Sequence, residues 1–434
     1  MEARRARVEI TYNGAAITTQ LFGKYSEFTY ADPASGEADS VDIALNDRDR
    51  QWITAWLPTK GDTLTAAIET QNWDKEGERR SLQCGFFILD DYNFTGWPMT
   101  GTLSGVSVPA DTSLRDTERT RNWENITIQE IGKEIAKRAG IELVWDVDGE
   151  PITVKSVEQS KKADCDFYAE LCAAYGLATK VYARKIVVYD REAYKAKDTV
   201  AKVTITEKIM ETMSWHSSLS GTYTGGEYTY TDPTTEEEIK VSVGTGTRIL
   251  KKNGKADSLA DAERKIKAEV ANANHSATTM SVTIPGMIDI VASSCVTVVG
   301  VGRLSGKYFV DKVTSHVSAS GGYTMDLELS LVDNMTEEVI KDAIQRLVAV
   351  GVINTPAYWE QHYKDVLYLD GLILNMATMI KVNAGGSSIT TVDAALQVLT
   401  DTGVINSPDY WAEKHSALTY LDTLIIKAAN ALTK

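Results

Sequence analysis

The chain has 434 residues, of which 43% are hydrophobic, and its formal net charge is −15. This length predicts two to four domains, each able to bury a core. The acidity argues against broad nucleic-acid binding, which needs clustered Lys and Arg, and no apolar run is long enough to span a bilayer. The basic N-terminus, MEARRARVEI, lacks the apolar segment of a secretory signal, so we expect the chain to stay in the cytoplasm where it is made.

The first segment, residues 1–108, has the pattern of a small β-barrel or sandwich. Short alternating runs recur between turn signals, and Asn13-Gly14 is a favoured hairpin dipeptide. The expected strands are Arg7–Tyr12, Ile17–Leu21, Glu27–Tyr30, Val41–Leu45, Leu64–Glu69, Gly85–Asp90 and Thr100–Val108.

The second segment, residues 109–198, changes to a helical period and predicts a compact α+β domain. A charged loop at Asp111–Arg121 leads to Thr127 and Glu130, which have the spacing of a capping box, and Gly140 stands where that helix should end. The other expected elements are a strand at Glu142–Trp145, a helix at Asp164–Tyr175 and a hairpin of Thr179–Tyr182 with Ile186–Tyr189.

The third segment, residues 199–333, returns to β structure and predicts a second barrel. One helix interrupts it, and Ser258 and Asp261 mark the start of that helix. The expected strands are Val203–Thr206, Ser220–Thr231, Ile239–Val243, Thr279–Ile284, Cys295–Val299, Tyr308–Val317 and Tyr323–Leu331.

The last hundred residues are helical and repetitive. Gly351–Trp359, GVINTPAYW, recurs as Gly403–Trp411, GVINSPDYW. In each copy Thr355 or Ser407 is a helix N-cap, and Pro follows at the first helical position. A flexible NAGGSS linker joins the copies. We expect two small three-helix units, helical repeat 1 at residues 334–384 and helical repeat 2 at residues 385–434, because two copies are too few for a solenoid.

We recognise no catalytic, cofactor-binding or metal-ligating constellation, and we expect no enzyme. The five histidines lack metal-ligand spacing. The four cysteines, Cys84, Cys165, Cys172 and Cys295, form no CxxC pair and are expected to be buried free thiols. Asp90 and Asp91 make a poor acid–base pair, because adjacent strand residues point to opposite faces.

The repeats carry one candidate contact surface for a partner or a cell wall. Tyr358 and Trp359 in the first copy match Tyr410 and Trp411 in the second, and paired modules with matched aromatics suit avid binding to a polymer. Residues 343–353 resemble the opening of S-layer homology modules, which bind cell-wall polymers, but the rest of that module has no counterpart. The alternative is a structural or protein-docking role with each Trp in a core.

The stretch Thr102–Gly140, TLSGVSVPADTSLRDTERTRNWENITIQEIGKEIAKRAG, resembles the late control protein D family. These proteins are the baseplate hubs of contractile phage tails and related tailocin-like particles. Further matches follow in the family's order at Ala38–Leu45, Ala163–Val188, Asp257–Val270, Gly300–Val317 and Gly322–Leu331. Together they cover about residues 1–332, and the helical repeats depart from the family.

The resemblance implies an α+β chain with two β-barrel domains, an inserted α+β domain and the all-α repeats behind them. It implies a homotrimer whose six barrels form a ring around a central channel. The ring would adapt the sixfold tail tube to a threefold central spike and would contact baseplate wedge and tape measure proteins. Such a chain resides in the virion or tail-like particle after assembly in the bacterial cytoplasm, and its acidity fits a lumen that does not retain DNA.

A cell-wall-binding or lytic tail-tip protein acting through the repeats is the alternative function. The missing catalytic residues argue against lysis. A spike fused to the hub would require a long repetitive β-helix after the second barrel, whereas helices follow it here.

Overall fold

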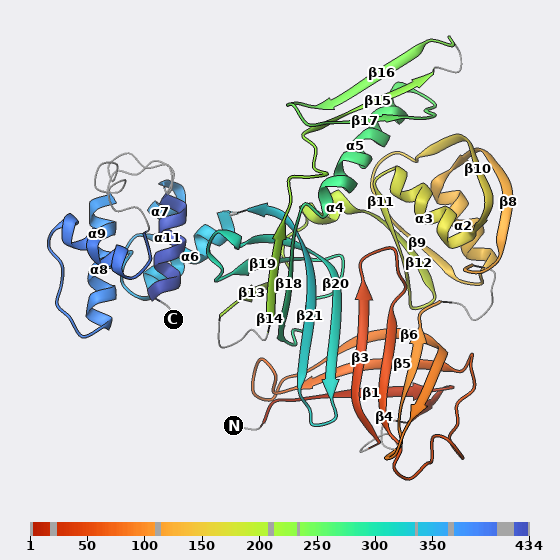
Figure 1. Ribbon diagram of the computed structural model, residues 1–434, viewed down its shortest axis with the longest axis horizontal. Helices are drawn as coiled ribbons and strands as arrows, with labels where there is room; N and C mark the ends of the chain where they lie inside the picture. Colours follow the sequence, from red (N-terminus) through yellow and green to blue (C-terminus); the bar gives the residue numbers. More distant parts are fainter. Residues whose placement is uncertain are drawn as a thin grey trace. The chain divides into compact units, whose positions relative to one another are not determined.

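The computed structural model describes residues 3–17, 24–108, 114–206, 212–231, 235–334, 337–362, 369–405 and 421–432 (Figure 1). The chain divides into two compact units, and each is described by itself. Unit 1 comprises Met1–Val200, Ile209–Cys295 and Phe309–Leu331, and unit 2 comprises Ala201–Lys208, Val296–Tyr308 and Val332–Lys434.

Unit 1 is built on one continuous sheet, with strand order β14-β18-β21-β20-β3-β4-β7-β6-β5-β1-β2. The strands whose register is described pair antiparallel along this path. Their bounds are β1 (Arg5–Tyr12), β2 (Ala15–Ala16), β3 (Tyr25–Pro33), β4 (Ser40–Asn46), β5 (Thr63–Gln71), β6 (Arg79–Thr95), β7 (Thr100–Val106), β14 (Thr212–Ser217), β18 (Thr278–Pro285), β20 (Gly306–Ser318) and β21 (Tyr323–Asn334).

The sheet joins two parts of the chain that lie far apart in the sequence. β3 pairs with β20, from Glu27 opposite Ser318 to Pro33 opposite Lys312. The first and third sequence segments therefore share one sheet path through these two strands. The Asn13-Gly14 hairpin forms as expected, with φ of 45° and 80° at the two residues. Residues 18–21 of the expected strand Ile17–Leu21 lie outside the described residues.

The inserted segment packs two helices against a small sheet. The capping box of α2 (Ile128–Arg138) is confirmed: the Thr127 side chain accepts from the Glu130 amide at 3.1 Å, and Glu130 accepts from the Thr127 amide at 3.0 Å. Gly140 follows with φ of 66°. The remaining elements are β9 (Glu142–Asp146), α3 (Asp164–Ala174), β11 (Leu177–Tyr182), β12 (Lys185–Asp190) and α4 (Arg191–Ala196).

One polar strand in this segment begins within the expected loop, and the strand that pairs with it was not predicted. Residues 118–121 of the expected loop Asp111–Arg121 belong to β8 (Glu118–Thr127), which pairs with β10 (Thr153–Ala163). Only Trp123 in β8 is buried, so the strand lacks the apolar alternation by which strands are recognised. β8 is a strand because it pairs with β10, and its side-chain pattern alone does not indicate one.

A second small sheet follows β14. β15 (Gly225–Thr231) pairs antiparallel with β16 (Glu238–Gly244) and parallel with β17 (Ile249–Asn253). α5 (Leu259–His275), capped by Ser258 as expected, covers one face of it. The expected strand Ser220–Thr231 was too long, because the Thr222 amide bonds to the Leu219 carbonyl and makes a turn before β15.

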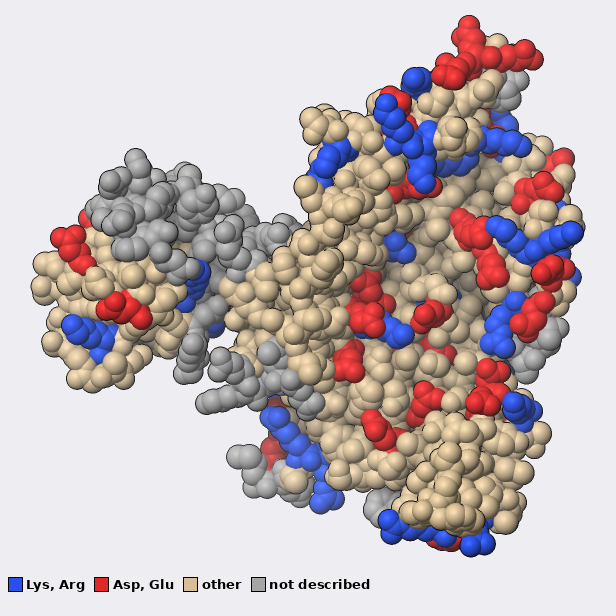
Figure 2. Space-filling model, in the orientation of Figure 1, with Lys and Arg blue, Asp and Glu red and all other residues tan. Residues whose placement is uncertain are grey.

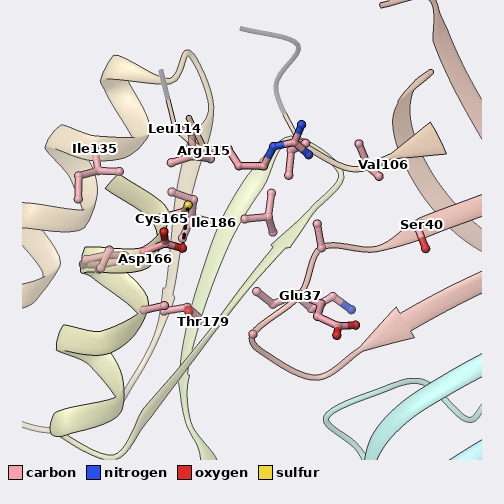
Figure 3. Close-up of a pocket in the computed structure, with 17 residues that line it drawn as sticks. Glu37, Ser40, Val106, Leu114, Arg115, Ile135, Cys165, Asp166, Thr179 and Ile186 are labelled. Atoms are coloured by element: carbon pink, nitrogen blue, oxygen red, sulfur yellow. Dashed lines mark hydrogen bonds between the residues drawn. The ribbon is translucent and has the colours of Figure 1, made fainter. Parts of the chain in front are cut away.

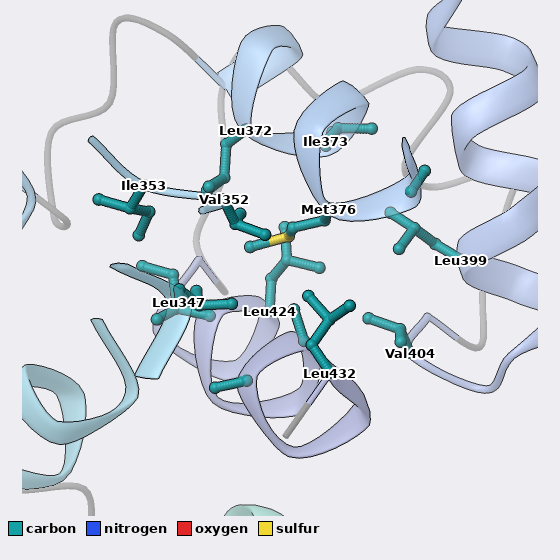
Figure 4. Close-up of a cluster of buried hydrophobic side chains, with 14 of the residues drawn as sticks. Leu347, Val352, Ile353, Leu372, Ile373, Met376, Leu399, Val404, Leu424 and Leu432 are labelled. Carbon is teal, nitrogen blue, oxygen red and sulfur yellow. The ribbon is translucent and has the colours of Figure 1, made fainter. Parts of the chain in front are cut away.

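Unit 2 contains the parallel pair of β13 (Ala201–Thr204) with residues 296–299 of β19 (Cys295–Val299), the short η1 (Gly302–Leu304) and the C-terminal helices. The described helices are α6 (Glu337–Ala349), α7 (Pro356–His362), α8 (Leu369–Asn383), α9 (Val392–Asp401) and α11 (Leu421–Leu432). Leu347, Met376, Leu399 and Leu424, from both sequence copies, lie in one buried cluster (Figure 4).

The described helices of the two expected repeats therefore bury their apolar side chains in one shared cluster. Part of the expected flexible linker is also fixed, because the Gly386 amide bonds to the Lys381 carbonyl at 2.8 Å and closes α8.

Candidate functional site

One face of the unit 1 sheet is polar across eight neighbouring strands, and we call it the polar face. Cross-strand partners lie on the same face of a sheet, so the strand registers assign its members, and the contact of His316 in β20 with Asp326 in β21 joins its two halves. They are Thr212, Ser214 and His216 of β14; Thr279, Ser281, Thr283 and Pro285 of β18; Thr324, Asp326, Glu328 and Ser330 of β21; Lys312, Thr314, His316 and Ser318 of β20; Glu27, Thr29, Ala31 and Pro33 of β3; Ser40, Asp42, Ala44 and Asn46 of β4; Thr100, Thr102, Ser104 and Val106 of β7; and Ile88, Asp91, Asn93 and Thr95 of β6.

Between the two edge strands, the opposite face of the sheet is apolar and buried. Phe28, Ile43, Leu103, Val282, Val317 and Leu327 are each at most 2% exposed. Burial of this face orients every strand, because a slip by one residue would turn the apolar set to water. The polar face is thus fixed by the core behind it.

A row of hydrogen bonds crosses the polar face. Thr212 and Thr283 hydroxyls lie 2.8 Å apart, and Thr283 donates to Asp326 at 2.6 Å. His316 lies 3.1 Å from Asp326 through Nε2 and 3.0 Å from Glu27 through Nδ1. These bonds span β14, β18, β21, β20 and β3 and hold the side chains close to the sheet.

The polar face carries a net negative charge. Its members include five carboxylates against one lysine, Lys312, and its large apolar residues, Ile88 and Val106, lie opposite each other at one end. Figure 2 shows acidic side chains gathered over the region of β20, β3 and β4, with few basic ones between them. Such a face repels phosphate and offers a passing polymer little to adhere to.

Both ends of the polar face are open strand edges among the described residues. β14 ends the strand order. At the other end, β5 pairs with β6 only as far as Ile88, so residues 90–95 of β6 have β7 on one side and no described strand on the other. β14, TMSWHS, has no Lys, Pro or other residue that blocks strand pairing.

Exposed large apolar side chains lie beside both edges. Trp215 in β14 is 39% exposed and Leu219, just after it, is 72% exposed. Trp97, in the turn after β6, is 69% exposed, and Arg50 stacks over its ring at 4.3 Å. Open edges flanked by exposed aromatics are typical of surfaces that pair with another chain.

The aromatic residues singled out in the sequence lie in or beside the helical core. Trp359 is 7% exposed and belongs to the buried cluster of unit 2. Tyr358 is partly buried and meets the Trp359 ring edge-on at 5.9 Å. Tyr410 and Trp411 lie outside the described residues.

Other sequence candidates do not assemble into a chemical site. Asp90 and Asp91 contact different bases, Arg115 at 3.8 Å and Lys60 at 3.7 Å. Within the described residues no group of three His, Cys, Asp or Glu could hold a metal ion. All four cysteines are free, and three of them are buried while Cys165 is partly exposed. No helix in the described part of the chain is long and apolar enough to cross a membrane.

A cavity of about 470 Å³ lies between the β3–β4 connection and the helices of the inserted segment (Figure 3). Ile135 of α2, Cys165 of α3 and Ile186 of β12 line it. The Cys165 thiol lies 3.5 Å from Asp166, and burial together with that carboxylate raises the pKa of Cys165 to about 11. This thiol therefore stays protonated at neutral pH and is a poor nucleophile.

The polar face escaped the sequence interpretation because its members come from eight strands. A signal was present in each strand, since Ser, Thr or Asp alternates with apolar residues in β18 and β21. Only the strand order shows that the polar residues of these strands form one surface.

No family model matches the chain. Among curated proteins, the probable baseplate hub protein of Escherichia phage 186 is 28% identical over 178 residues, which cover 41% of this chain and 43% of that protein. The probable baseplate hub protein of Escherichia phage P2 is 26% identical over 212 residues, which cover 48% and 52%. The matches span about half the length of these relatives. The expected similarity to baseplate hub proteins is confirmed.

Solved structures share the fold. A tail protein from Neisseria meningitidis superposes with a TM-score of 0.58 at 14% identity, covering 76% of this chain and 97% of that one. A prophage tail protein from Shewanella oneidensis gives a TM-score of 0.55 at 14% identity, covering 75% and 98%.

Proposed function

We propose that the chain is a structural hub protein of a contractile tail or tail-like particle. In this role it would form a homotrimeric ring around an axial channel, between the tail tube and a central spike. The similarity to the two phage hub proteins supports the assignment. The single structural observation that carries it is the polar face, which in the described part of the chain is eight strands wide and has a free strand edge at each end.

The two edges of the polar face are different, so they suit head-to-tail association. β14 of one copy would pair with the outer half of β6 in the next, and each copy would offer both edges. A contact of this kind repeats around an axis until the ring closes. The first and third segments, expected as two barrels, would each supply four strands to the ring's inner wall.

In such a ring the polar face would line the channel. Between the two edge strands its opposite face is already buried by the chain's own core, so the polar face is the one left for water. With five carboxylates against one lysine, this lining would let DNA pass without being retained. The tube, spike, wedge and tape measure proteins are the proposed partners, in the tail baseplate.

The mass of the full-length protein by sedimentation velocity tests the assembly. We expect a trimer, and images of it should show a ring with an open centre. Leu219→Glu places a charge beside β14, near the acidic β6 edge of the next copy, and should shift the protein to monomer. Leu259→Glu is the matched control, because Leu259 is 57% exposed at the start of α5 and lies at neither edge.

A wild-type protein that stays monomeric at every concentration and forms no ring with its tube and spike would overturn the trimer. If both glutamate variants changed the mass equally, the β14 edge would not be the interface.

A further inference from the structure

A buried ionic cluster joins the inserted segment to the main sheet within unit 1. The Lys180 ammonium of β11 contacts the Asp32 carboxylate of β3 and lies 3.1 Å from Asp39, just before β4. The three side chains are 12%, 5% and 0% exposed. Residues 148 positions apart in the chain therefore share one charge cluster in the interior.

Two neutral groups complete the cluster. The Tyr30 hydroxyl donates to Asp39 Oδ2 at 2.7 Å, and the Ala292 amide donates to Asp32 Oδ2 at 2.8 Å. The first, second and third sequence segments meet here. The proposed ring and its channel do not use the residues of this cluster.

The hairpin that carries Lys180 also makes uncharged contacts with the sheet. The Tyr182 hydroxyl donates to the Gln83 carbonyl at 3.0 Å, and the Ala183 amide donates to Ser107 Oγ at 3.0 Å. The Gly36 amide donates to the Thr179 carbonyl at 3.3 Å. The hairpin of β11 and β12 would stay docked on these contacts if the charges changed.

The cluster contains two carboxylates and one ammonium, so it buries a net negative charge when both acids are ionised. An unbalanced buried charge is costly, and a proton on one carboxylate removes it. Burial raises the pKa of Asp39 to about 7, and Asp32 adds to the rise while Lys180 and Tyr30 oppose it. Burial alone would lower the pKa of Lys180, but the two carboxylates outweigh it and raise that pKa, so the ammonium keeps its charge. The titratable and charged groups around Asp39 are Tyr30 and Asp32 from β3, Cys84 from β6, and Lys180 and Tyr182 from β11.

We propose that this cluster is a proton-dependent latch, which holds the β11–β12 hairpin more tightly against the sheet in mildly acidic solution than above neutral pH. When the hairpin undocks, Asp39 meets water and returns to an ordinary carboxyl pKa near 4. The docked state therefore binds more protons between about pH 4 and 7, and docking strengthens as the pH falls through that window. Above about pH 8 Asp39 is ionised in the docked state, so docking bears the full cost of the buried negative charge.

Hydrogen–deuterium exchange on the full-length protein measures the latch at the hairpin itself. Protection of the Ala183 amide, corrected for intrinsic exchange rates, should rise about tenfold from pH 8 to pH 6, as expected for one proton bound near pH 7. Asp39→Asn removes the titrating group and keeps a side-chain acceptor for Tyr30, so protection should become independent of pH. Asp90→Asn, at an exposed carboxylate outside the cluster, should keep the wild-type response.

Equal pH responses of the wild type and Asp39→Asn would overturn the proposal. If Asp39→Asn fails to fold, Lys180→Met gives a second readout. It leaves two buried carboxylates without a counter-charge, so protection should fall more steeply above neutral pH than in the wild type. An unchanged slope in Lys180→Met would overturn the proposal equally.

Discussion

A single glycine decides how closely the two helices of the inserted segment approach. Gly132 lies in α2 beneath Tyr168 of α3, whose hydroxyl donates to the Ile128 carbonyl at 3.1 Å. A Cβ at position 132 would clash with that hydroxyl and lie 3.1 Å from Leu143 Cδ2. Helix propensity alone would favour alanine here, so packing has overridden it.

Gly132→Ala should therefore destabilise unit 1, against the usual direction for a helix interior. We expect a loss of about 1–3 kcal/mol, the range for overpacking a tight core. Urea denaturation followed by tryptophan fluorescence measures it. Gly371→Ala is the control, because a Cβ there meets no atom within 4 Å, and α8 should gain up to about 1 kcal/mol. A stabilised Gly132→Ala protein would show that the helices can separate freely.

At the scale of elements, the C-terminal helices depend on one another across the two sequence copies. Leu372 and Met376 of α8 lie in the same cluster as Leu399 of α9 and Leu424 of α11 (Figure 4). Repetition in sequence thus does not mark independent folding units here. It marks two halves of a shared core.

Ending the full-length chain after Asn383 should therefore unfold the helices that remain from the first copy. Their apolar faces would lose the partners that bury them, and helices this short are marginal alone. Circular dichroism should lose more helix than the deleted residues account for, and proteases should cleave within residues 337–383. Retained protection of α6 and α8 would show that the first copy folds alone.

At the scale of the whole molecule, the polar face is a property of strand order. Each strand contributes two to four polar side chains, and together they carry five carboxylates against one lysine. Part of the chain's acidity therefore lies on the face that a ring would turn inward.

Reversing charge on this face should create DNA retention. Asp42→Lys with Asp91→Lys changes the same net charge as the control, Asp148→Lys with Glu150→Lys in the exposed turn before β10. At low salt the face variant should bind labelled duplex DNA about tenfold more tightly than the control, because its cations sit on one surface. Fluorescence anisotropy measures both affinities. Equal binding by the two variants would show that the charge of the polar face does not control the retention of DNA.

Local chemistry let the sequence determine several elements by itself. The capping box at Thr127 and Glu130, the cap at Ser258 and the Asn13-Gly14 hairpin form as predicted, because each depends on residues close in the chain. The order of segments also sufficed to indicate similarity to baseplate hub proteins. Charged strands such as β8 escaped prediction, because only their pairing partner defines them.

Tertiary structure alone decided which distant residues meet. It joined β3 to β20, placed Lys180 between Asp32 and Asp39, and merged two helical copies into one core. These arrangements depend on strand order and on the burial of surfaces contributed by several segments. No local pattern contains that information, because a half-buried strand shows which of its faces is polar but not which strand lies beside it.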